Sequence, residues 1–407
     1  MDTIQPIEDN FRKLFNATPL IIRAPGRINL IGEHTDYNQG WVLPAAIDKS
    51  INLAIGKRPG KGISLYSLDY NEQYEATLDN VRPSGKLWPD YILGVVEQFQ
   101  KKGHQLEGFN IVFGGDIPLG AGLSSSAALE CATATALNRL FDLGYGPLEL
   151  ALLSQAAENE FVGVKCGLMD QYASIFGKKD HLIKLDCAKQ EHVYVPFTAQ
   201  NIRIVLFDTQ VKHSLASSAY NKRREECEAG VSYIHAHHPQ VQSLRDVSAD
   251  MLLNYVKPRD ETVFRRCSYV VGEMERLQKA CRYLQENDFE QFGKCMFETH
   301  EGLRDQYEVS CPELDLLVDM VKDRPEVPGA RMMGGGFGGC TINLVRAGEA
   351  EILAAEIAVR YQEATNTPLK TYFVSIEDGA GQVTAPSYSD NVKSGSRTSS
   401  PPFRADS

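Results

Sequence analysis

Short apolar runs separated by turn-forming residues recur in the first part of the chain, a pattern typical of buried strands. They predict strands at residues 21–23, 51–55 and 109–113. Two further runs, 63–68 and 73–78, are close enough in the sequence to predict a hairpin. We therefore expect a sheet in this part of the chain.

Three segments of the same region have helical patterns instead. The opening segment, MDTIQPIEDNFRKLF, predicts an amphipathic helix, and residues 127–140 are rich in Ala and Leu. Residues 88–100 predict another helix, on which Trp88 and Tyr91 present flat aromatic faces suited to a nucleotide base. Plain core packing of these two aromatics is the simpler interpretation, and both stay open.

The second half of the chain repeats the mixture. We expect three strands within residues 181–210 and mostly helix over 214–305. A strand at 340–345, a helix at 349–365 and a strand at 371–376 follow, and no internal repeat is visible. The pattern by itself thus predicts mixed α and β structure.

The length of 407 residues exceeds one typical hydrophobic core, so we predict two domains. We place them at residues 1–200 and 201–380. Residues 381–407 are rich in Ser, Pro and Gly and cannot bury a core, which predicts a disordered tail.

Charge and hydropathy narrow the class of partner. A net charge of −11 leaves no basic surplus to neutralise phosphates, so we expect no nucleic-acid partner. Since there is no run of 18 apolar residues, we expect no membrane span. The first residues also lack the basic and apolar regions of a signal peptide.

The nine cysteines include no CxxC pair, which fits reduced thiols and predicts a cytoplasmic protein. Cys166 is the candidate for reaction with thiol reagents, and an inert buried thiol is the open alternative. The histidines at 235, 237 and 238 match no usual zinc spacing, so we expect a solvated helix end there.

The segment RAPGRINLIGEHTDYNQGWVLPAAID, residues 23–48, places Arg27, Glu33, His34 and Asp36 within ten residues. So many ionisable groups cannot all point into apolar packing, because burying unpaired charge costs several kcal/mol. Carboxylates accept two or more hydrogen bonds each and therefore suit a polyol. A polar surface loop is the plain alternative.

A second motif, GGDIPLGAGLSSSAAL, lies between the strand predicted at 109–113 and the helix predicted at 127–140. Gly120 and Gly122 let the backbone bend, and the helix start offers unpaired N–H groups to an anion such as phosphate. The motif is neither a Walker loop nor a dinucleotide fingerprint. An ordinary turn with a serine N-cap is the alternative.

A third motif, ENEFVGVKCGLMDQY, carries Glu158 and Asp170 twelve residues apart. The GVKCG sequence between them should break any helix, so the two carboxylates lie on separate elements. One can then hold a cation while the other accepts a proton, although a helix end followed by a loop would read the same.

These motifs resemble those of galactokinases, within the wider GHMP kinase family. GRINLIGEHTDY resembles the galactokinase signature, PLGAGLSSSAALE the phosphate loop of the family, and CGLMDQY the segment with its catalytic aspartate. DTQVKHSLASSAYNKRREEC resembles a segment that contributes a sugar-contacting tyrosine, and MMGGGFGGCTINLV the third, Gly-rich motif. All five occur in the expected order, from about residue 20 to about residue 375. One slight departure is Tyr172, where phenylalanine is frequent.

The resemblance implies a fold that the pattern alone does not give. It is α+β, with an N-terminal mixed-sheet domain containing a left-handed βαβ crossover. The C-terminal domain is a ferredoxin-like α/β sandwich, and the active site lies between the two.

The resemblance also implies transfer of the ATP γ-phosphoryl group to O1 of α-D-galactose, giving galactose 1-phosphate. Asp170 would be the catalytic base, and Arg27 would keep it ionised. The residues expected to bind the sugar are Glu33, His34, Thr35, Asp36 and Tyr220.

The phosphates of ATP would lie on Gly120, Ala121, Gly122, Leu123, Ser124, Ser125 and Ser126. Mg²⁺ would be held by Ser126 and Glu158. The loop with Gly335, Gly336 and Gly338 would close near the substrates, a plain β-turn being the alternative. We expect a monomer that takes galactose and Mg-ATP.

Two other functions stay open on the sequence. One is a GHMP kinase for another sugar, such as N-acetylgalactosamine or arabinose. The other is a galactose sensor that no longer transfers phosphate, which the uninterrupted GLSSSAA loop disfavours.

Overall fold

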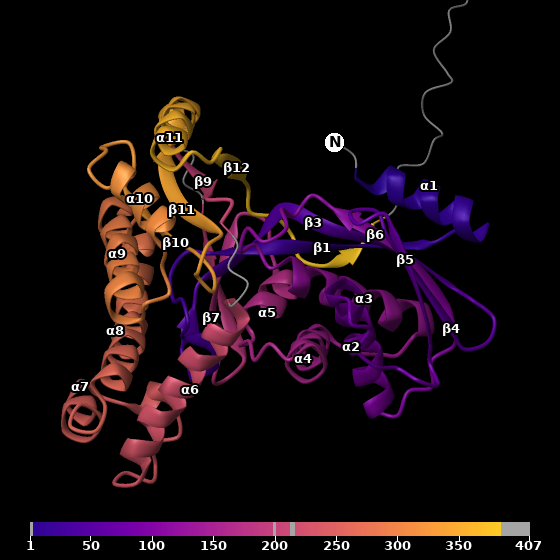
Figure 1. Cartoon of the computed structure of the whole chain (residues 1–407), viewed down its shortest axis with the longest axis horizontal. Helices are drawn as coiled ribbons and strands as arrows, with labels where there is room; N and C mark the ends of the chain where they lie inside the picture. The colour runs from indigo at the N-terminus through magenta and orange to yellow at the C-terminus, as the bar shows by residue number, and fades with distance from the viewer. Residues whose placement is uncertain (1–2, 198–200, 212–215, 384–407) are drawn as a thin grey trace, which may run out of the picture.

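The computed structural model describes residues 3–197, 201–211 and 216–383 (Figure 1). Its first sheet has six strands in the order β13-β1-β3-β6-β4-β5. All neighbours are antiparallel except β4 and β6, which makes the sheet mixed. Its first five strands along the chain are β1 (Leu20–Asn29), β3 (Pro44–Lys57), β4 (Gly62–Ser67), β5 (Glu72–Thr77) and β6 (Phe109–Gly115).

Helices cover both faces of this sheet. The amphipathic α1 (Ile4–Phe15) lies on one face, where Ile7 and Phe11 are buried. The other face carries the remaining helices of this half, which enclose the largest apolar cluster of the protein's described residues. They are α2 (Leu87–Lys101), α3 (Ser125–Phe141), α4 (Pro147–Ala157) and α5 (Met169–Phe176).

The second large sheet is antiparallel, with the order β10-β11-β9-β12. This is the strand order of a ferredoxin-like βαββαβ unit, with helices after its first and third strands. Its strands are β9 (Ile202–Asp208), β10 (Gly329–Met332), β11 (Cys340–Arg346) and β12 (Lys370–Val374). Its helices are α6 (Ala216–His235), α7 (Ala249–Met251), α8 (Glu261–Gln285), α9 (Phe289–Glu301), α10 (Pro312–Val321) and α11 (Ala350–Thr365).

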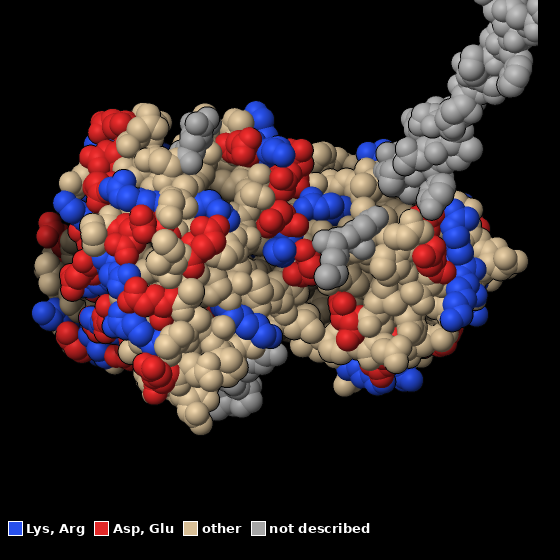
Figure 2. All heavy atoms as spheres, turned by 90° about the horizontal axis from the view of Figure 1, so that it is seen from above, with Lys and Arg blue, Asp and Glu red and all other residues tan. Residues whose placement is uncertain are grey.

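A small sheet of β2 (Trp41–Val42), β7 (His181–Asp186) and β8 (Glu191–Pro196) lies between the two halves. Acidic and basic side chains are interspersed over the face seen in Figure 2. Within the described ranges, no helix is long and apolar enough to cross a membrane.

The strands, hairpin and helices predicted from the sequence are confirmed, although β1 and β3 extend up to six and seven residues beyond the strands predicted at 21–23 and 51–55. Positions 214 and 215 of the predicted helical region lie outside the described residues. The histidines at 235 and 237 are exposed at the end of α6, as expected. The division into residues 1–200 and 201–380 and the hand of the crossover stay predictions.

One boundary is wrong. The predicted tail begins at residue 381, but β13 (Gly381–Gln382) pairs with β1 in the first sheet. Val383 N–H also donates to the Ile21 carbonyl. Low apolar content concealed this strand, because a two-residue edge strand needs only backbone hydrogen bonds. Residues 384–407 lie outside the described chain.

Candidate active site

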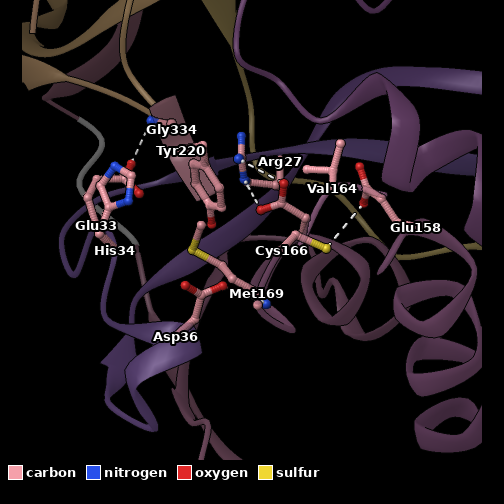
Figure 3. A pocket seen from close by; sticks show the side chains of 13 residues that line it. Arg27, Glu33, His34, Asp36, Glu158, Val164, Cys166, Met169, Tyr220 and Gly334 are labelled. Carbon is pink, nitrogen blue, oxygen red and sulfur yellow. Dashed lines mark hydrogen bonds and ion pairs between the residues drawn. The ribbon is translucent and has the colours of Figure 1, made fainter. Parts of the chain in front are cut away.

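A cavity of about 120 Å³ brings residues from four distant segments together (Figure 3). They are the end of β1 with the turn after it, the segment from the end of α4 to the start of α5, the first part of α6, and the loop between β10 and β11. Its walls are formed by Arg27, Glu33, His34, Asp36, Glu158, Val164, Cys166, Gly167, Met169, Asp170, Tyr220, Gly334 and Gly335.

The centre of the cavity is the ion pair between Arg27 on β1 and Asp170 on α5. Nε of Arg27 lies 2.8 Å from Oδ1 of Asp170 and Nη2 lies 3.1 Å from Oδ2. Two parallel hydrogen bonds of this kind fix both side chains in one geometry. Burial lowers the pKa of the Arg27 guanidinium, but Asp170 and then Glu33 raise it above its ordinary value.

The predicted phosphate loop adjoins this pair. Ser124 donates to Oδ2 of Asp170 at 2.5 Å, and Nη1 of Arg27 donates to the Gly122 carbonyl at 2.5 Å. Gly120 and Gly122 have φ of +79° and +75°, and Ser124 has φ of +59° just before α3. The loop therefore bends tightly and leads into a helix N-terminus beside Asp170, the geometry of an anion site.

The Gly-rich loop between β10 and β11 packs against this phosphate loop. A Cβ at Gly334 would lie 3.3 Å from the Gly122 carbonyl oxygen, and one at Gly339 would lie 3.3 Å from that of Ala121. Gly334 and Gly335 also line the cavity. The loop thus touches the sites expected for both substrates, and the positive φ of Gly336 and Gly338 is also what a plain glycine turn requires, so both interpretations stay open.

Glu158 forms the far end of the cavity, at the C-terminal end of α4. Its carboxyl is buried and hydrogen-bonded by Ser126 and by Nε2 of Gln171, the latter at 2.7 Å. Burial and the nearby Asp170 raise its pKa to about 7. Two oxygen donors beside excess negative charge suit a hard cation.

No three His, Cys, Asp or Glu side chains in the described ranges are grouped as a metal site. The donor pair of Ser126 and Glu158 nevertheless matches the way Mg²⁺ is usually held, by one or two protein ligands plus substrate phosphates. These residues therefore fit the ion.

Glu33 lies at the opposite end of the cavity, and one of its two carboxylate oxygens is hydrogen-bonded to the protein. Its Oε1 accepts from the Gly334 N–H at 2.7 Å and from Nη2 of Arg331 at 3.1 Å. Burial raises its pKa, but Arg331 and then Arg27 lower it to a net value below the ordinary one. Glu33 is thus an ionised hydrogen-bond acceptor at neutral pH.

Arg331 was not found by sequence reasoning. It is fully buried and also donates to the backbone carbonyls of Asn29, Leu30 and Met332, at 2.5 to 2.9 Å. It therefore fixes the end of β1 and the Glu33 carboxylate together. Its only sequence signal is its place just before the Gly-rich motif.

Asp36 lies in a short 3-10 turn and is pressed against the backbone of Gly167. A Cβ at Gly167 would lie 2.0 Å from Oδ2 of Asp36, so any larger residue there would displace the carboxyl. Burial and then the nearby Asp170 raise the pKa of Asp36 to about 6. Asp36 is thus held in the wall in an unfavourable electrostatic position.

Thr35 does not line the cavity, in contrast to the other residues expected to bind the sugar. It is fully buried, and its hydroxyl hydrogen-bonds to the carbonyls of Gly32 and Trp41 at 2.9 and 2.6 Å. The Thr35 hydroxyl therefore closes the turn, and the expectation that Thr35 binds the sugar stays a prediction.

His34 and Tyr220 form an aromatic corner of the cavity, with ring centroids 5.4 Å apart. Burial lowers the pKa of His34 to about 4, so its imidazole is neutral at pH 7. Burial likewise raises the pKa of the Tyr220 hydroxyl well above its ordinary range. Both side chains thus offer neutral hydrogen-bonding groups.

Two residues of α8 hold the same turn from outside, and sequence reasoning missed both. The Gly32 N–H donates to Oε1 of Glu273 at 2.8 Å, and the Tyr269 hydroxyl donates to the Glu33 carbonyl at 3.2 Å. Both are fully buried on an otherwise ordinary amphipathic helix. Nothing in their local sequence distinguishes them from core positions.

The sequence left open whether Cys166 is a reactive thiol or an inert one. Cys166 is the one half-buried cysteine of the nine, but burial and Glu158 raise its pKa well above the ordinary value, which favours the inert thiol.

Trp88 and Tyr91 pack against the main apolar cluster, and Nε1 of Trp88 donates to Glu72 at 2.8 Å. Core packing is thus confirmed for Trp88, whereas Tyr91 is half-buried at the edge of the cluster and its contact with a nucleotide base stays a prediction.

Comparison with known proteins agrees with this architecture. Residues 90–178 match the GHMP kinases N terminal domain, and residues 280–362 match the GHMP kinases C terminal domain. Residues 9–57 match the galactokinase galactose-binding signature. The fold and the cavity are thus those of a GHMP kinase.

Individual relatives are more specific. The chain is 40% identical to a galactokinase of Roseiflexus sp., covering 93% of this chain and 96% of the relative. It is 42% identical to a galactokinase of Thermotoga neapolitana, covering 89% of this chain and 99% of the relative. The crystal structure of Lactococcus lactis galactokinase complexed with galactose superposes with a TM-score of 0.88 at 33% identity, covering 92% and 98%. The chain belongs to the galactokinase family of ATP-dependent sugar kinases.

Proposed function

We propose that the cavity binds α-D-galactose beside ATP and that Asp170 and Arg27 carry out transfer of the γ-phosphoryl group to O1. The products are α-D-galactose 1-phosphate and ADP. The observation that supports this most is the bidentate Arg27–Asp170 pair, which lies between sugar-side carboxylates and a phosphate loop.

Asp170 acts as the general base. It accepts the O1 proton as O1 attacks the γ-phosphorus and the bond to the β–γ bridging oxygen breaks, so the negative charge leaves with ADP. Arg27 orients the carboxylate and stabilises charge on the transferring phosphoryl group. Ser124 donates to the same carboxylate and links base and phosphate loop.

The sugar is held by the remaining wall residues. Glu33 and Asp36 accept hydrogen bonds from sugar hydroxyls, since carboxylates can accept several. His34 and Tyr220 close the same corner. Glu33 is assigned to the C6 hydroxyl and Asp36 to the edge with C3 and C4, where galactose and glucose differ.

The nucleotide phosphates lie on residues 120–126, at the start of α3. Mg²⁺, held by Ser126 and Glu158, would neutralise the charge of the β- and γ-phosphates. Gly335, Gly336 and Gly338 let the neighbouring loop approach both substrates closely. The monomeric state and cytoplasmic location expected from the sequence remain predictions.

A coupled ADP-release assay over a panel of sugars tests this proposal. We expect kcat/KM for galactose to exceed that for glucose by roughly 10³-fold, because the wrong C4 epimer leaves a buried polar group unpaired. Faster turnover of N-acetylgalactosamine or arabinose would overturn the choice of sugar. Galactose binding without ADP release would instead indicate a silent sensor.

A further inference from the structure

A chain of hydrogen bonds runs from the sugar cavity into the protein interior. Nδ1 of His34 lies 2.8 Å from the Tyr37 hydroxyl, which lies 2.7 Å from the Tyr307 hydroxyl. The Tyr307 hydroxyl in turn lies 3.3 Å from Sγ of Cys227. None of these partners of His34 belongs to the roles assigned above.

These hydrogen bonds join three separate parts of the sequence, and Tyr37 in the middle is half-buried and lines a second cavity. Tyr37 follows Asp36 in the 3-10 turn, Tyr307 lies after α9, and Cys227 lies on α6. Tyr307 and Cys227 are buried, and the His34 and Tyr307 rings pack with centroids 4.8 Å apart.

Either atom can be the donor in both hydrogen bonds of the Tyr307 hydroxyl, so their direction is inferred from the strength of the acceptors. Tyr307 can donate its proton either to the Tyr37 oxygen or to the Cys227 sulfur, and sulfur is the weaker acceptor. With Tyr307 donating to Tyr37, the Tyr37 hydroxyl donates to Nδ1 of His34. A neutral imidazole that accepts at Nδ1 carries its proton on Nε2.

Nε2 of His34 is the ring nitrogen left for the cavity. It is buried and makes no hydrogen bond of good geometry to the described residues, although the Gly335 backbone lies beside the ring. The same cavity contains the carboxylates of Glu33, Asp36 and Asp170, which only accept. A sugar oxygen that accepts a hydrogen bond needs a donor, and an Nε2–H group adds one to the Arg27 guanidinium and the Tyr220 hydroxyl in the same cavity.

We propose that Tyr37 and Tyr307 are positioning residues that fix His34 as its Nε2–H tautomer, so that the pocket presents a neutral donor to a sugar oxygen. This inference rests on the proposed function of the cavity.

The test combines the tautomer of His34 with steady-state kinetics of the full chain. Long-range ¹H–¹⁵N spectra of ¹⁵N-histidine-labelled protein report the tautomer, and His34→Gln assigns the signal. We expect Nε2–H in the wild type and a shift toward Nδ1–H in Tyr37→Phe. KM for galactose should rise about 5-fold with kcat nearly unchanged, as for one lost neutral hydrogen bond.

Tyr307→Phe provides a second variant if Tyr37→Phe folds poorly, and it should move both readouts in the same direction. Tyr361→Phe is the matched control. This buried tyrosine donates to the Thr209 carbonyl at 3.0 Å, and it does not line the cavity. The control should change neither tautomer nor KM.

The proposal fails if His34 of the wild type is protonated on Nδ1. It also fails if neither Tyr37→Phe nor Tyr307→Phe changes the tautomer of His34. A changed tautomer with an unchanged galactose KM would overturn the donor role of His34. If the wild type shows the Nε2–H tautomer but phosphorylates no sugar, the proposed function is wrong, whereas the positioning of His34 by Tyr37 and Tyr307 is supported.

Discussion

Replacing Asp36 with asparagine should make the free protein more stable while removing most of its activity on galactose. Asp36 is buried against the Gly167 backbone and near Asp170, and its pKa is about 6 instead of the ordinary 3.8. Asparagine keeps the shape and one acceptor oxygen but carries no charge. The site thus holds a charge that serves ligand binding at the expense of stability.

The magnitude follows from the pKa. Each tenfold change in proton affinity corresponds to about 1.4 kcal/mol, so ionised Asp36 costs the native state about 3 kcal/mol. The native carboxyl binds its proton more tightly than the unfolded one, so wild-type stability falls as pH rises from 3.8 through 6. The gain from Asp36→Asn should therefore be full at pH 8 and about half as large at pH 5.

Thermal melts at the two pH values measure this effect. For a chain of 407 residues, the unfolding entropy of about 2 cal/mol/K per residue converts 3 kcal/mol into a Tm increase of roughly 4 °C. Asp79→Asn, at an exposed position, controls for the loss of one negative charge. Galactose should raise the Tm of the wild type but not that of Asp36→Asn.

Two results would refute the reasoning. One is a variant that melts no higher than the wild type at pH 8. The other is a gain of equal size at pH 5 and pH 8, which would assign the effect to packing and not to ionisation.

Further predictions concern the rest of the site and the chain end. Asp170→Asn should lower kcat by about 10²- to 10⁴-fold while galactose still binds, and calorimetry with rate measurements on the purified variant separates the two effects. Glu158→Ala should raise the Mg²⁺ concentration needed for half-maximal activity, and an unchanged midpoint would remove it from the ligand set. Arg331→Met should lower Tm by several degrees and raise KM for galactose, because buried carbonyls and a pocket carboxylate lose their donor. A chain that ends at residue 379 should melt several degrees below one that ends at 383, since only the latter keeps β13; equal melting would contradict that role.

The local sequence was sufficient for most helices and strands and for the charged residues that face the cavity. Arg27, Glu33, Asp36 and Asp170 stand in short motifs, because the chemistry needs particular residue types at fixed spacing on one turn or helix start. The Ser-, Pro- and Gly-rich composition led to a wrong start for the predicted tail, because β13 is held by backbone pairing to β1 and not by burial of its side chains.

Only the tertiary structure decided which groups surround those residues. Thr35 lies within the signature, yet its hydroxyl closes the turn. Arg331, Glu273 and Tyr307 lie more than 200 residues from the turn whose residues they contact. A buried polar group needs a partner, but any segment that packs against it can supply one. The sequence therefore determined the reacting groups, and the packing of distant segments determined how they are held.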